Sequence, residues 1–495
     1  MKRLFNISIM KETDLKPAGI FHYFHEICQV PRPSKHEEQI VAYLKEFGEK
    51  HHLETKVDDA GNVVIRKPAT PGKENLKTVV LQGHTDMVCE KNSDVEHDFM
   101  KDAIQTEVDG DWLKAKGTTL GADDGIGVAA GLAILADESI EHGPIECLFT
   151  VDEETQLTGA NALKEGFMSG DILINLDSED DGQLFIGCAG GINTVGQLKY
   201  TQIDTPKDYY FFKVHVSGLV GGHSGDDINK NRACANKVLN RFLYQEAAKM
   251  DMYLCTIDGG NLHNAIAREA YAICAVPEEE KHTVRADLNI FISEIEDEYS
   301  VTEPHFKMTL ESVDSQPKAI DKKSAANLLK MLYAMPHGVF AMSQEIAGFV
   351  QTSTNLASVK MKEGNVIRIE TSQRSDITSS RNDIAAMVEI VMTMAGATAV
   401  HNDGYPGWKP NTHSEILNVT VASYKRLFNE EPIVRSIHAG LECGLFLQKY
   451  PNLDMISFGP QLVGVHSPDE RLLIPTVDKF WKLLLEILKN IPAKR

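Results

Sequence analysis

The sequence predicts an α/β protein in which a discontinuous domain, with a mostly parallel twisted sheet flanked by helices, carries an inserted α+β domain. Apolar strand candidates alternate with helix candidates up to about residue 190, which is the pattern of a parallel sheet covered by helices. Hairpins mix with helices over residues 191–399, and the alternation returns over 400–495. The expected division is therefore 1–190 with 400–495 as one domain, and 191–399 as the insertion.

The first part begins with an amphipathic helix. Ser34 and Glu37 have the spacing of a capping box, and apolar residues recur at helical intervals over 40–47. Short apolar runs bounded by turn residues then predict strands. We expect these strands over residues 53–57, 62–66, 78–82, 145–151 and 171–176, and a buried Ala-rich helix over 126–135.

The middle part combines helices with strands, two of which look like a hairpin. A Lys-Glu-Gly turn joins the hairpin strands 354–360 and 365–370. Other strands are expected over 211–216, 254–257, 271–276 and 306–310, and helices over 233–243, 325–333 and 384–395. The last part has strand candidates over 433–438 and 455–458, and a closing helix over 477–488.

Composition excludes several classes of protein. The chain has 495 residues, 42% hydrophobic and 24% charged, so it can form sizeable cores. Its 50 Lys and Arg against 71 Asp and Glu leave a net charge of −21, which argues against nucleic acid or an anionic membrane as partner. The eight cysteines include no C-x-x-C pair and are expected to be reduced. We find neither a signal peptide nor an apolar run of transmembrane length, and expect a cytoplasmic location.

Acidic and imidazole side chains follow several of the apolar strands. The first such segment is GHTDM at 83–87, directly after the strand at 78–82. His84 is a candidate metal ligand, and Asp86 can accept its other ring N–H and so orient the ring. The alternative is a surface turn that happens to contain His and Asp. Ligands in open α/β sheets bind at the carboxyl ends of strands, which favours a site here.

The second segment is LGADDGIG at 120–127, which opens the Ala-rich helix. A glycine-rich turn into a helix can hold phosphate, but two adjacent aspartates would repel it, and no G-x-x-x-x-G-K-[ST] motif is present. A carboxylate that bridges two metal ions, Asp123, is the better functional interpretation. Helix capping is the alternative, and it suffices for Asp124.

Three further segments supply ligand candidates. Glu153 and Glu154 follow the strand at 145–151, where one can ligate a metal while the other takes a proton from water. Asp177 follows the strand at 171–176, and His466 follows the one at 455–458. Each has an ordinary structural alternative: a solvated helix face for the glutamates, a turn or helix cap for Asp177, and a structural role for His466.

Taken together, these residues form a balanced site for two divalent metal ions. They provide two His, one Asp of bridging type, one further Asp and one Glu, with a second Glu beside them. Nitrogen and oxygen ligands of this kind suit Zn²⁺, and also Co²⁺ or Mn²⁺. The competing motifs H-E-x-x-H, G-x-S-x-G and G-x-G-x-x-G are absent from the sequence.

Nearly the whole chain resembles the co-catalytic di-zinc exopeptidases, a family that includes carboxypeptidase G and the carnosinases. The motifs that carry the resemblance are KPAT (67–70), GTTLGAD (117–123), GCAGGI (187–192), GGHSG (221–225), YPGW (405–408), HAGLECGLF (438–446) and HSPDE (466–470). One departure is TQLTGA at 155–160, where the family is expected to begin with Ala-Gly. That difference touches the loop after the glutamate pair and removes no ligand.

The resemblance implies a role for each candidate residue. One metal is held by His84 and Asp177 and the other by Glu154 and His466, with Asp123 bridging, Asp86 orienting His84, and Glu153 as general base. His223 stabilises the tetrahedral intermediate, Arg374 binds the substrate's terminal carboxylate, and Asn264 contacts substrate.

The activity implied is hydrolysis of Xaa-His and other small dipeptides by a metal-bridging hydroxide. The domain 1–190 with 400–495 would hold the metals, and 191–399 would serve as lid and dimerisation domain of a homodimer. A related deacylase or carbamoylase, or a metal-containing binding protein without catalysis, are the alternatives.

Overall fold

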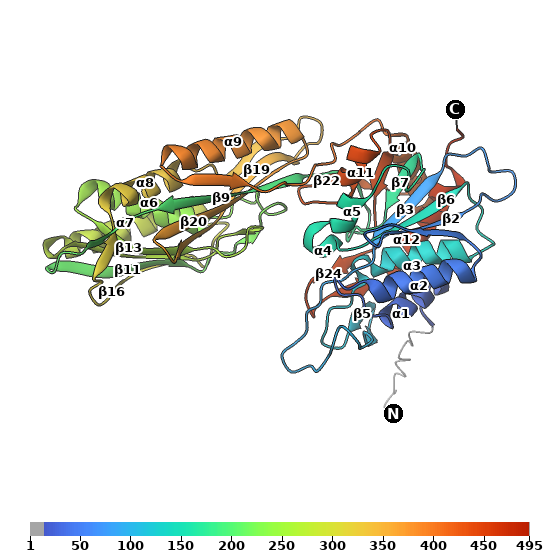
Figure 1. The fold of residues 1–495 in the computed structure, drawn as a ribbon, viewed down its shortest axis with the longest axis horizontal. Coiled ribbons are helices and arrows are strands. Elements are labelled where there is room, and N and C mark those ends of the chain that lie inside the picture. Colours follow the sequence, from blue (N-terminus) through green and yellow to red (C-terminus); the bar gives the residue numbers. More distant parts are fainter. Residues whose placement is uncertain (1–13, 495) are drawn as a thin grey trace, which may run out of the picture. The chain divides into compact units, whose positions relative to one another are not determined.

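The computed structural model describes residues 14–494, which divide into two compact units (Figure 1). Unit 1 comprises the chain up to Gly187 together with Pro410–Ser436 and the residues from Glu442 onward. Unit 2 comprises Cys188–Lys409 and Ile437–Leu441. The amino-terminal segment, on which the expectation of no signal peptide rests, lies outside the described residues.

Unit 1 is built on an eight-stranded mixed sheet with the order β1-β2-β6-β3-β7-β23-β8-β22. The central strands β6, β3, β7 and β23 run parallel, whereas β1 and β2 pair antiparallel with their neighbours and β8 pairs antiparallel with β23. Every residue of β3, β6 and β7 is buried, as expected for strands covered on both faces. The strands are β1 Glu54–Val57, β2 Val63–Lys67, β3 Val79–His84, β6 Ile145–Thr150, β7 Ile172–Asn175, β8 Gln183–Cys188, β22 Ile433–Ile437 and β23 Asp454–Ser457.

Helices pack around this sheet, so the predicted α/β class is confirmed. α1 packs against α3, which packs on β3, and α10 packs against β23 and α12. The helices of unit 1 are α1 Ala18–Cys28, α2 Glu38–Lys50, α3 Ala122–Ala136, α4 Glu153–Gln156, α5 Thr158–Ala162, α10 Glu415–Phe428, α11 Cys443–Lys449 and α12 Ile474–Lys489. A small sheet joins β4 Thr106–Asp109 and β5 Trp112–Ala115 to β24 Leu462–Val463 and β25 Arg471–Leu473.

The register of the parallel strands brings their carboxyl ends together. His84 at the end of β3 is paired with Thr150 at the end of β6. Gln82 of β3 is paired with Asn175, the last residue of β7. The loops that follow these three strands therefore begin at one edge of the sheet, which is where ligands bind in open α/β folds.

Unit 2 contains a nine-stranded sheet with the order β16-β11-β15-β13-β19-β20-β9-β21, and β18 pairs with β19. Its strands are β9 Gly190–Lys199, β11 Tyr209–Ser217, β13 Tyr253–Gly259, β15 Ala270–Pro277, β16 Lys307–Ser312, β18 Gly338–Met342, β19 Val350–Lys362, β20 Val366–Ser375 and β21 Thr398–His401. The pairs are antiparallel, and β19 and β20 form the predicted hairpin. Two-stranded pairs, β10 Gln202–Asp204 with β17 Lys318–Ile320 and β12 Gly222–His223 with β14 Ala265–Ile266, complete the unit.

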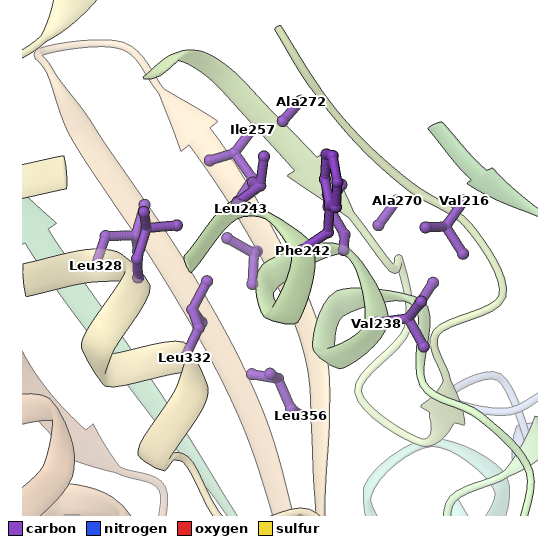
Figure 2. Packing of buried hydrophobic residues seen from close by; sticks show 14 of the residues in the cluster. Val216, Val238, Phe242, Leu243, Ile257, Ala270, Ala272, Leu328, Leu332 and Leu356 are labelled. Carbon is purple, nitrogen blue, oxygen red and sulfur yellow. The ribbon is translucent and has the colours of Figure 1, made fainter. Parts of the chain in front are cut away.

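The core of unit 2 lies between this sheet and its helices, α6 Ala235–Lys249, α7 Lys281–Tyr299, α8 Lys322–Ala334 and α9 Thr378–Met394. Figure 2 shows Phe242 and Leu243 of α6 and Leu328 of α8 among residues of the sheet such as Ile257 and Leu356. All five are buried. At about 1.5–3 kcal/mol for each buried large apolar side chain, this packing is the main stabilising contribution to unit 2.

Some elements differ from the sequence prediction. The capping box is wrong: α2 begins at Glu38, and its N-cap Glu37 makes no side-chain capping bond. The prediction also omitted α7 and α10. α7 buries only Val284, Leu288, Phe291 and Ile295 along 19 residues, so its apolar stripe is thin and its polar residues dominate.

No helix within residues 14–494 is both long and apolar enough to cross a membrane. All eight cysteines lie within the described residues, and none of them forms a disulfide.

Candidate metal centre

The candidate metal centre of unit 1 is organised around the carboxylate of Asp123. Its Oδ1 lies 3.2 Å from His84 Nε2, and its Oδ2 lies 3.1 Å from His466 Nε2. Asp123 stands at the start of α3 but has extended backbone angles, φ −80° and ψ 109°. Each carboxylate oxygen thus faces one imidazole, an arrangement suited to a carboxylate that bridges two cations.

Two further carboxylates flank the centre, one on each side. Asp177 Oδ1 lies 3.6 Å from His84 Nε2. Glu154 Oε2 lies 2.9 Å from His466 Nε2. Ligand atoms of His84, Asp123 and Glu154 also lie within 4.8 Å of one another. The five ligand candidates therefore converge in two halves that share Asp123.

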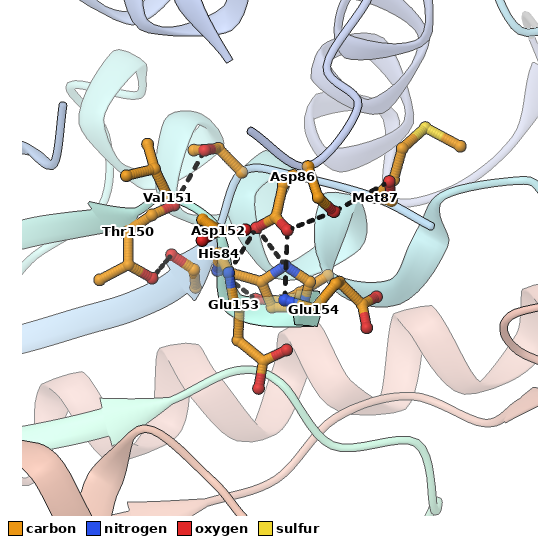
Figure 3. Close-up of polar contacts among 12 residues, drawn as sticks. His84, Asp86, Met87, Thr150, Val151, Asp152, Glu153 and Glu154 are labelled. Carbon is orange, nitrogen blue, oxygen red and sulfur yellow. Dashed lines mark hydrogen bonds and ion pairs between the residues drawn. The ribbon is translucent and has the colours of Figure 1, made fainter. Parts of the chain in front are cut away.

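Asp86 holds both His84 and the turn that carries the glutamate pair (Figure 3). Its Oδ1 lies 3.4 Å from His84 Nδ1. Its two oxygens also accept hydrogen bonds from the backbone N–H groups of Glu153, at 3.0 Å, and Glu154, at 3.2 Å. Because Asp86 occupies the Nδ1 side of the ring, His84 presents Nε2 to Asp123 and Asp177.

The charges of this cluster are strongly coupled. Burial would lower the pKa of His84, but the carboxylates of Asp177, Asp123 and Asp86 raise it well above its usual value. Hydrogen bonds to Asp123 and Glu154 raise the pKa of His466 to about 11. Burial raises the pKa of Asp177 to about 7. Protons held on these imidazole and carboxyl groups therefore balance negative charge that bound metal ions would also balance.

A buried carboxylate oxygen without a hydrogen-bond partner is further evidence that these residues suit a metal centre. Glu154 Oε1 is buried and has no hydrogen-bond partner within residues 14–494. A buried carboxylate oxygen without a donor is costly unless a cation meets it. Two imidazoles and three carboxylates form a ligand set that divalent transition metals accept.

Glu153 lies beside the ligand candidate Glu154, and Figure 3 shows the two side chains diverging from their shared turn. Burial raises the pKa of Glu153 well above its usual value, and the carboxylates of Asp177, Glu442 and Glu154 add to the effect. A carboxylate that readily takes up a proton is suited to general base catalysis. Burial also raises the pKa of Glu154, so the two residues differ in position, with Glu154 beside His466.

Asp124 has the capping role expected for it and a second contact besides. Its Oδ1 accepts a hydrogen bond from Gly127 N at 3.2 Å, which caps the first turn of α3. Its Oδ2 accepts one from His84 N, also at 3.2 Å. Asp124 is buried, so this carboxylate ties the start of α3 to the end of β3.

Glu470 makes contacts within the candidate site that the sequence did not predict. Its carboxylate accepts hydrogen bonds from four successive backbone N–H groups, of Leu120 at 2.7 Å, Gly121 at 2.9 Å, Ala122 at 2.8 Å and Asp123 at 3.3 Å. Glu470 is buried and lies four residues after His466. The HSPDE motif contained this signal, because an acidic residue so close to a ligand is a candidate for holding a second ligand in place.

Ser34 and Glu37, the residues of the supposed capping box, support the site instead. Ser34 Oγ donates to Asp86 Oδ2 at 2.8 Å. Glu37 Oε1 accepts from Asp152 N at 3.0 Å. The departure at 155–160 has a local structural effect, since the Thr155 and Thr158 hydroxyls donate to Asp152. These contacts define the turn that leads from β6 into the glutamate pair.

In unit 2 the predicted residues His223 and Arg374 lie together. Arg374 Nη2 is 3.5 Å from His223 Nε2, and Arg374 Nη1 donates to Tyr405 Oη at 3.1 Å. His223 Nδ1 accepts backbone hydrogen bonds from Gly225 at 3.3 Å and Asp226 at 3.2 Å. Burial, and then Arg374, lower the pKa of His223. His223 Nε2 thus faces the guanidinium of Arg374, and the two side chains border a common space.

Asn264 and His438 lie on the same part of unit 2. The exposed Asn264 accepts a hydrogen bond from Ser224 N at its backbone carbonyl, at 2.8 Å, next to the His223 loop. His438 Nε2 lies 2.7 Å from Ser353 Oγ. Burial, and then Arg374, lower the pKa of His438 to about 3. The sequence reasoning assigned no role to His438, although it opens the HAGLECGLF motif.

Residues 80–490 match Peptidase family M20/M25/M40. The chain is 43% identical over 482 residues to the cytosol non-specific dipeptidase of Escherichia coli, covering 97% of this chain and 99% of that protein. Among solved structures it is similar to aminoacylhistidine dipeptidase from Vibrio alginolyticus, with 42% identity, a TM-score of 0.90, and 98% and 99% of the two chains covered. An aminopeptidase PepT from Bacillus cereus, at 15% identity, shares the fold with a TM-score of 0.59 over 96% of this chain and 99% of the other. The chain therefore belongs to the M20/M25/M40 family of peptidases.

Proposed function

We propose that this chain is a metal-dependent dipeptidase that hydrolyses Xaa-His and other small dipeptides. The observation that carries the proposal is the position of Asp123, with one carboxylate oxygen facing His84 and the other facing His466. Two divalent ions would be held there, one by His84 and Asp177 and one by Glu154 and His466. Zn²⁺ fits this nitrogen and oxygen ligand set, and Co²⁺ or Mn²⁺ fit it as well.

The bound ions would polarise the scissile carbonyl and make a water nucleophilic at neutral pH. Glu153 takes the proton of the attacking water and later returns a proton to the leaving amine. Asp86 holds the His84 ring through Nδ1 and the Glu153 backbone through its N–H, so one carboxylate orients both a ligand and the base.

The charged ends of a dipeptide match the charges of the two units. The acidic cluster of unit 1 suits a cationic amino group. Arg374 suits the carboxylate, since its guanidinium is buried and its Nε has no partner among the described residues. His223 offers Nε2–H as a donor to the oxyanion that develops in the transition state. Asn264, which neighbours the His223 loop, is proposed to contact substrate.

The alternative functions differ from a dipeptidase in the substrates that they would hydrolyse. A deacylase or carbamoylase of the same architecture would act on N-acyl or N-carbamoyl amino acids, which lack the cationic amino group. A binding protein without catalysis would have no need of Glu153 beside the ligands. The relatives named dipeptidases cover nearly the whole chain, which favours dipeptide hydrolysis.

A turnover assay tests the proposal. The zinc-loaded protein is given carnosine, Gly-His and Gly-Leu, and N-acetyl-His as the matched substrate without an amino group. Release of free histidine from Gly-His but not from N-acetyl-His supports the dipeptidase. Preferential release from N-acetyl-His would favour the deacylase, and no turnover of any substrate by a protein with verified metal content would favour the binding protein.

We also propose a cytoplasmic homodimer. Support for the dimer comes from unit 2, where β21 is an edge strand and α9 is next to it. Met387, Ile390 and Met394 of α9 are exposed, as is Val400 of β21. An apolar stripe beside an open strand edge fits a second copy of the same surface. A relative named for the cytosol supports the location.

A further inference from the structure

A line of buried polar side chains crosses the four parallel strands of unit 1 at their carboxyl ends. It contains Thr150 of β6, Gln82 of β3, Asn175 of β7 and Ser457 of β23, and it reaches Glu442, the residue before α11. All five side chains are fully buried. Polar residues of this kind are unusual at the centre of a parallel sheet, where apolar side chains are the rule.

The hydrogen bonds of this line all point towards Glu442. Ser457 Oγ donates to Asn175 Oδ1 at 2.5 Å, and Asn175 Nδ2 donates to Gln82 Oε1 at 2.6 Å. Gln82 Nε2 and Thr150 Oγ1 then donate to Glu442 Oε2, at 2.6 and 2.7 Å. Because each amide donates through nitrogen and accepts through oxygen, the final acceptor determines how both amides are oriented.

Glu442 is balanced only at a distance, by the positive charge of His84. Within residues 14–494 it forms no salt bridge with Lys, Arg or His, and its second oxygen, Oε1, is buried without a hydrogen-bond partner. Its side chain does not cap α11. A buried carboxyl group held in this way costs stability, so an apolar residue would serve the fold better.

The line lies directly below the residues of the metal centre. Gln82 stands two residues before His84 in β3, and residues two apart in a strand share one face. Asn175 is the last residue of β7 and stands two residues before Asp177. Thr150 is paired with His84, and its carbonyl accepts a hydrogen bond from Thr85 N at 2.8 Å. Glu442 is thus bonded to β3 and β6 where the ligand-bearing loops begin.

We propose that Glu442 is a positioning residue of the metal centre: as the terminal acceptor of this line, it aligns the strand ends that carry His84, the glutamate pair and Asp177. The inference rests on the proposed metal-dependent function. A buried carboxyl group without an ion pair lowers the stability of the fold. We infer that Glu442 is useful because it places the metal ligands accurately, as residues that hold metal ligands in place commonly do.

The test compares Glu442→Gln, Glu442→Ala and Thr150→Val with a matched control, Glu146→Ala. Glu146 is also a buried glutamate and lies at the other end of β6, where it pairs with Arg66. Chelator-stripped proteins are titrated with Zn²⁺ by calorimetry, and the visible spectrum of the Co²⁺-loaded proteins reports ligand geometry. Thermal unfolding of the metal-free proteins measures stability separately.

Glu442→Ala should weaken metal binding about 10–100-fold and alter the Co²⁺ spectrum. Glu442→Gln retains an acceptor oxygen for Gln82 and Thr150, so it should rescue both properties. Glu146→Ala should lower the melting temperature and leave metal affinity and spectrum at parental values. Thr150→Val removes one hydrogen bond to Glu442 with little change of shape and should weaken metal binding by a smaller factor. If Glu442→Ala fails to fold, the metal affinity of Thr150→Val decides whether Glu442 has the positioning role.

Parental affinity and an unchanged Co²⁺ spectrum in Thr150→Val, and in Glu442→Ala if it folds, would overturn the positioning role and leave the proposed function intact. If the parent protein itself binds fewer than two ions, the proposed centre fails, and the inference about Glu442 fails with it.

Discussion

Glu470 accepts a hydrogen bond from the backbone N–H of Asp123, 347 positions earlier in the chain. The same carboxylate also binds the three preceding N–H groups, so the loop that presents Asp123 is held by a residue from the loop of His466. Two ligand candidates that face each other in space are therefore connected to one buried side chain.

Removing this clamp should disturb both halves of the centre. Glu470→Ala leaves four buried backbone donors without their acceptor, and we expect metal affinity to fall about 10–100-fold. Calorimetric titration of the metal-free protein measures the change. Glu415→Ala is a control, because Glu415 lies on α10 and binds Lys77. Equal metal affinity in both variants would refute the role of Glu470.

Metal removal should abolish activity. Exhaustive chelation, verified by elemental analysis, leaves the acidic cluster without the ions that activate water, and added Zn²⁺, Co²⁺ or Mn²⁺ should restore turnover. Fully loaded protein should contain two ions per chain. Full activity in demonstrably metal-free protein would contradict the proposed mechanism.

The two adjacent glutamates should give different phenotypes. Glu153→Gln should keep both metals and lower kcat by at least about 10²-fold, the usual scale for a lost general base. Glu154→Gln should instead weaken metal binding, since Glu154 Oε2 lies beside His466. Metal content and kcat measured on the same samples separate the two roles, and reversed phenotypes would show that we have exchanged them.

His223→Ala should lower kcat by about 10²–10³-fold with little change in KM or metal content, because a donor to the oxyanion acts mainly in the transition state. The proposed dimer adds a second expectation. Mixed dimers of Glu153→Gln and His223→Ala chains should recover activity if the partner chain supplies this histidine. Verified mixed dimers without activity would argue that His223 acts within its own chain or not in catalysis.

His438 should make unit 2 less stable at acidic pH. Its folded-state pKa of about 3 lies below the value of about 6.5 in the unfolded chain, so only the unfolded chain takes up this proton between those values. Stability is therefore lost as pH falls below about 6.5, by about 2 kcal/mol between that point and pH 5. Denaturant unfolding of metal-free parent and His438→Gln at pH 7 and pH 5 should show a smaller loss in the variant. Equal losses would contradict the assigned pKa.

Composition and pattern were enough to predict the fold class and the candidate residues. Mostly apolar runs such as 145–151 favour strands inside a covered sheet, and His84, the glutamate pair and Asp177 follow such runs. Local patterns were less reliable where several roles suit one residue. Ser34 has the chemistry of a helix cap, yet its hydroxyl binds Asp86, because a tertiary partner outcompeted the local one.

Only the tertiary structure decided how these residues act together. Nothing in the order of the chain places Glu470 on the Asp123 loop, or Glu442 at the end of a line through Gln82 and Asn175. Those contacts join residues 93 to 360 positions apart, and strand order and register decide which of them meet. Periodicity and composition report the local environment of each residue, whereas the pairing of distant side chains follows from how the whole sheet is assembled.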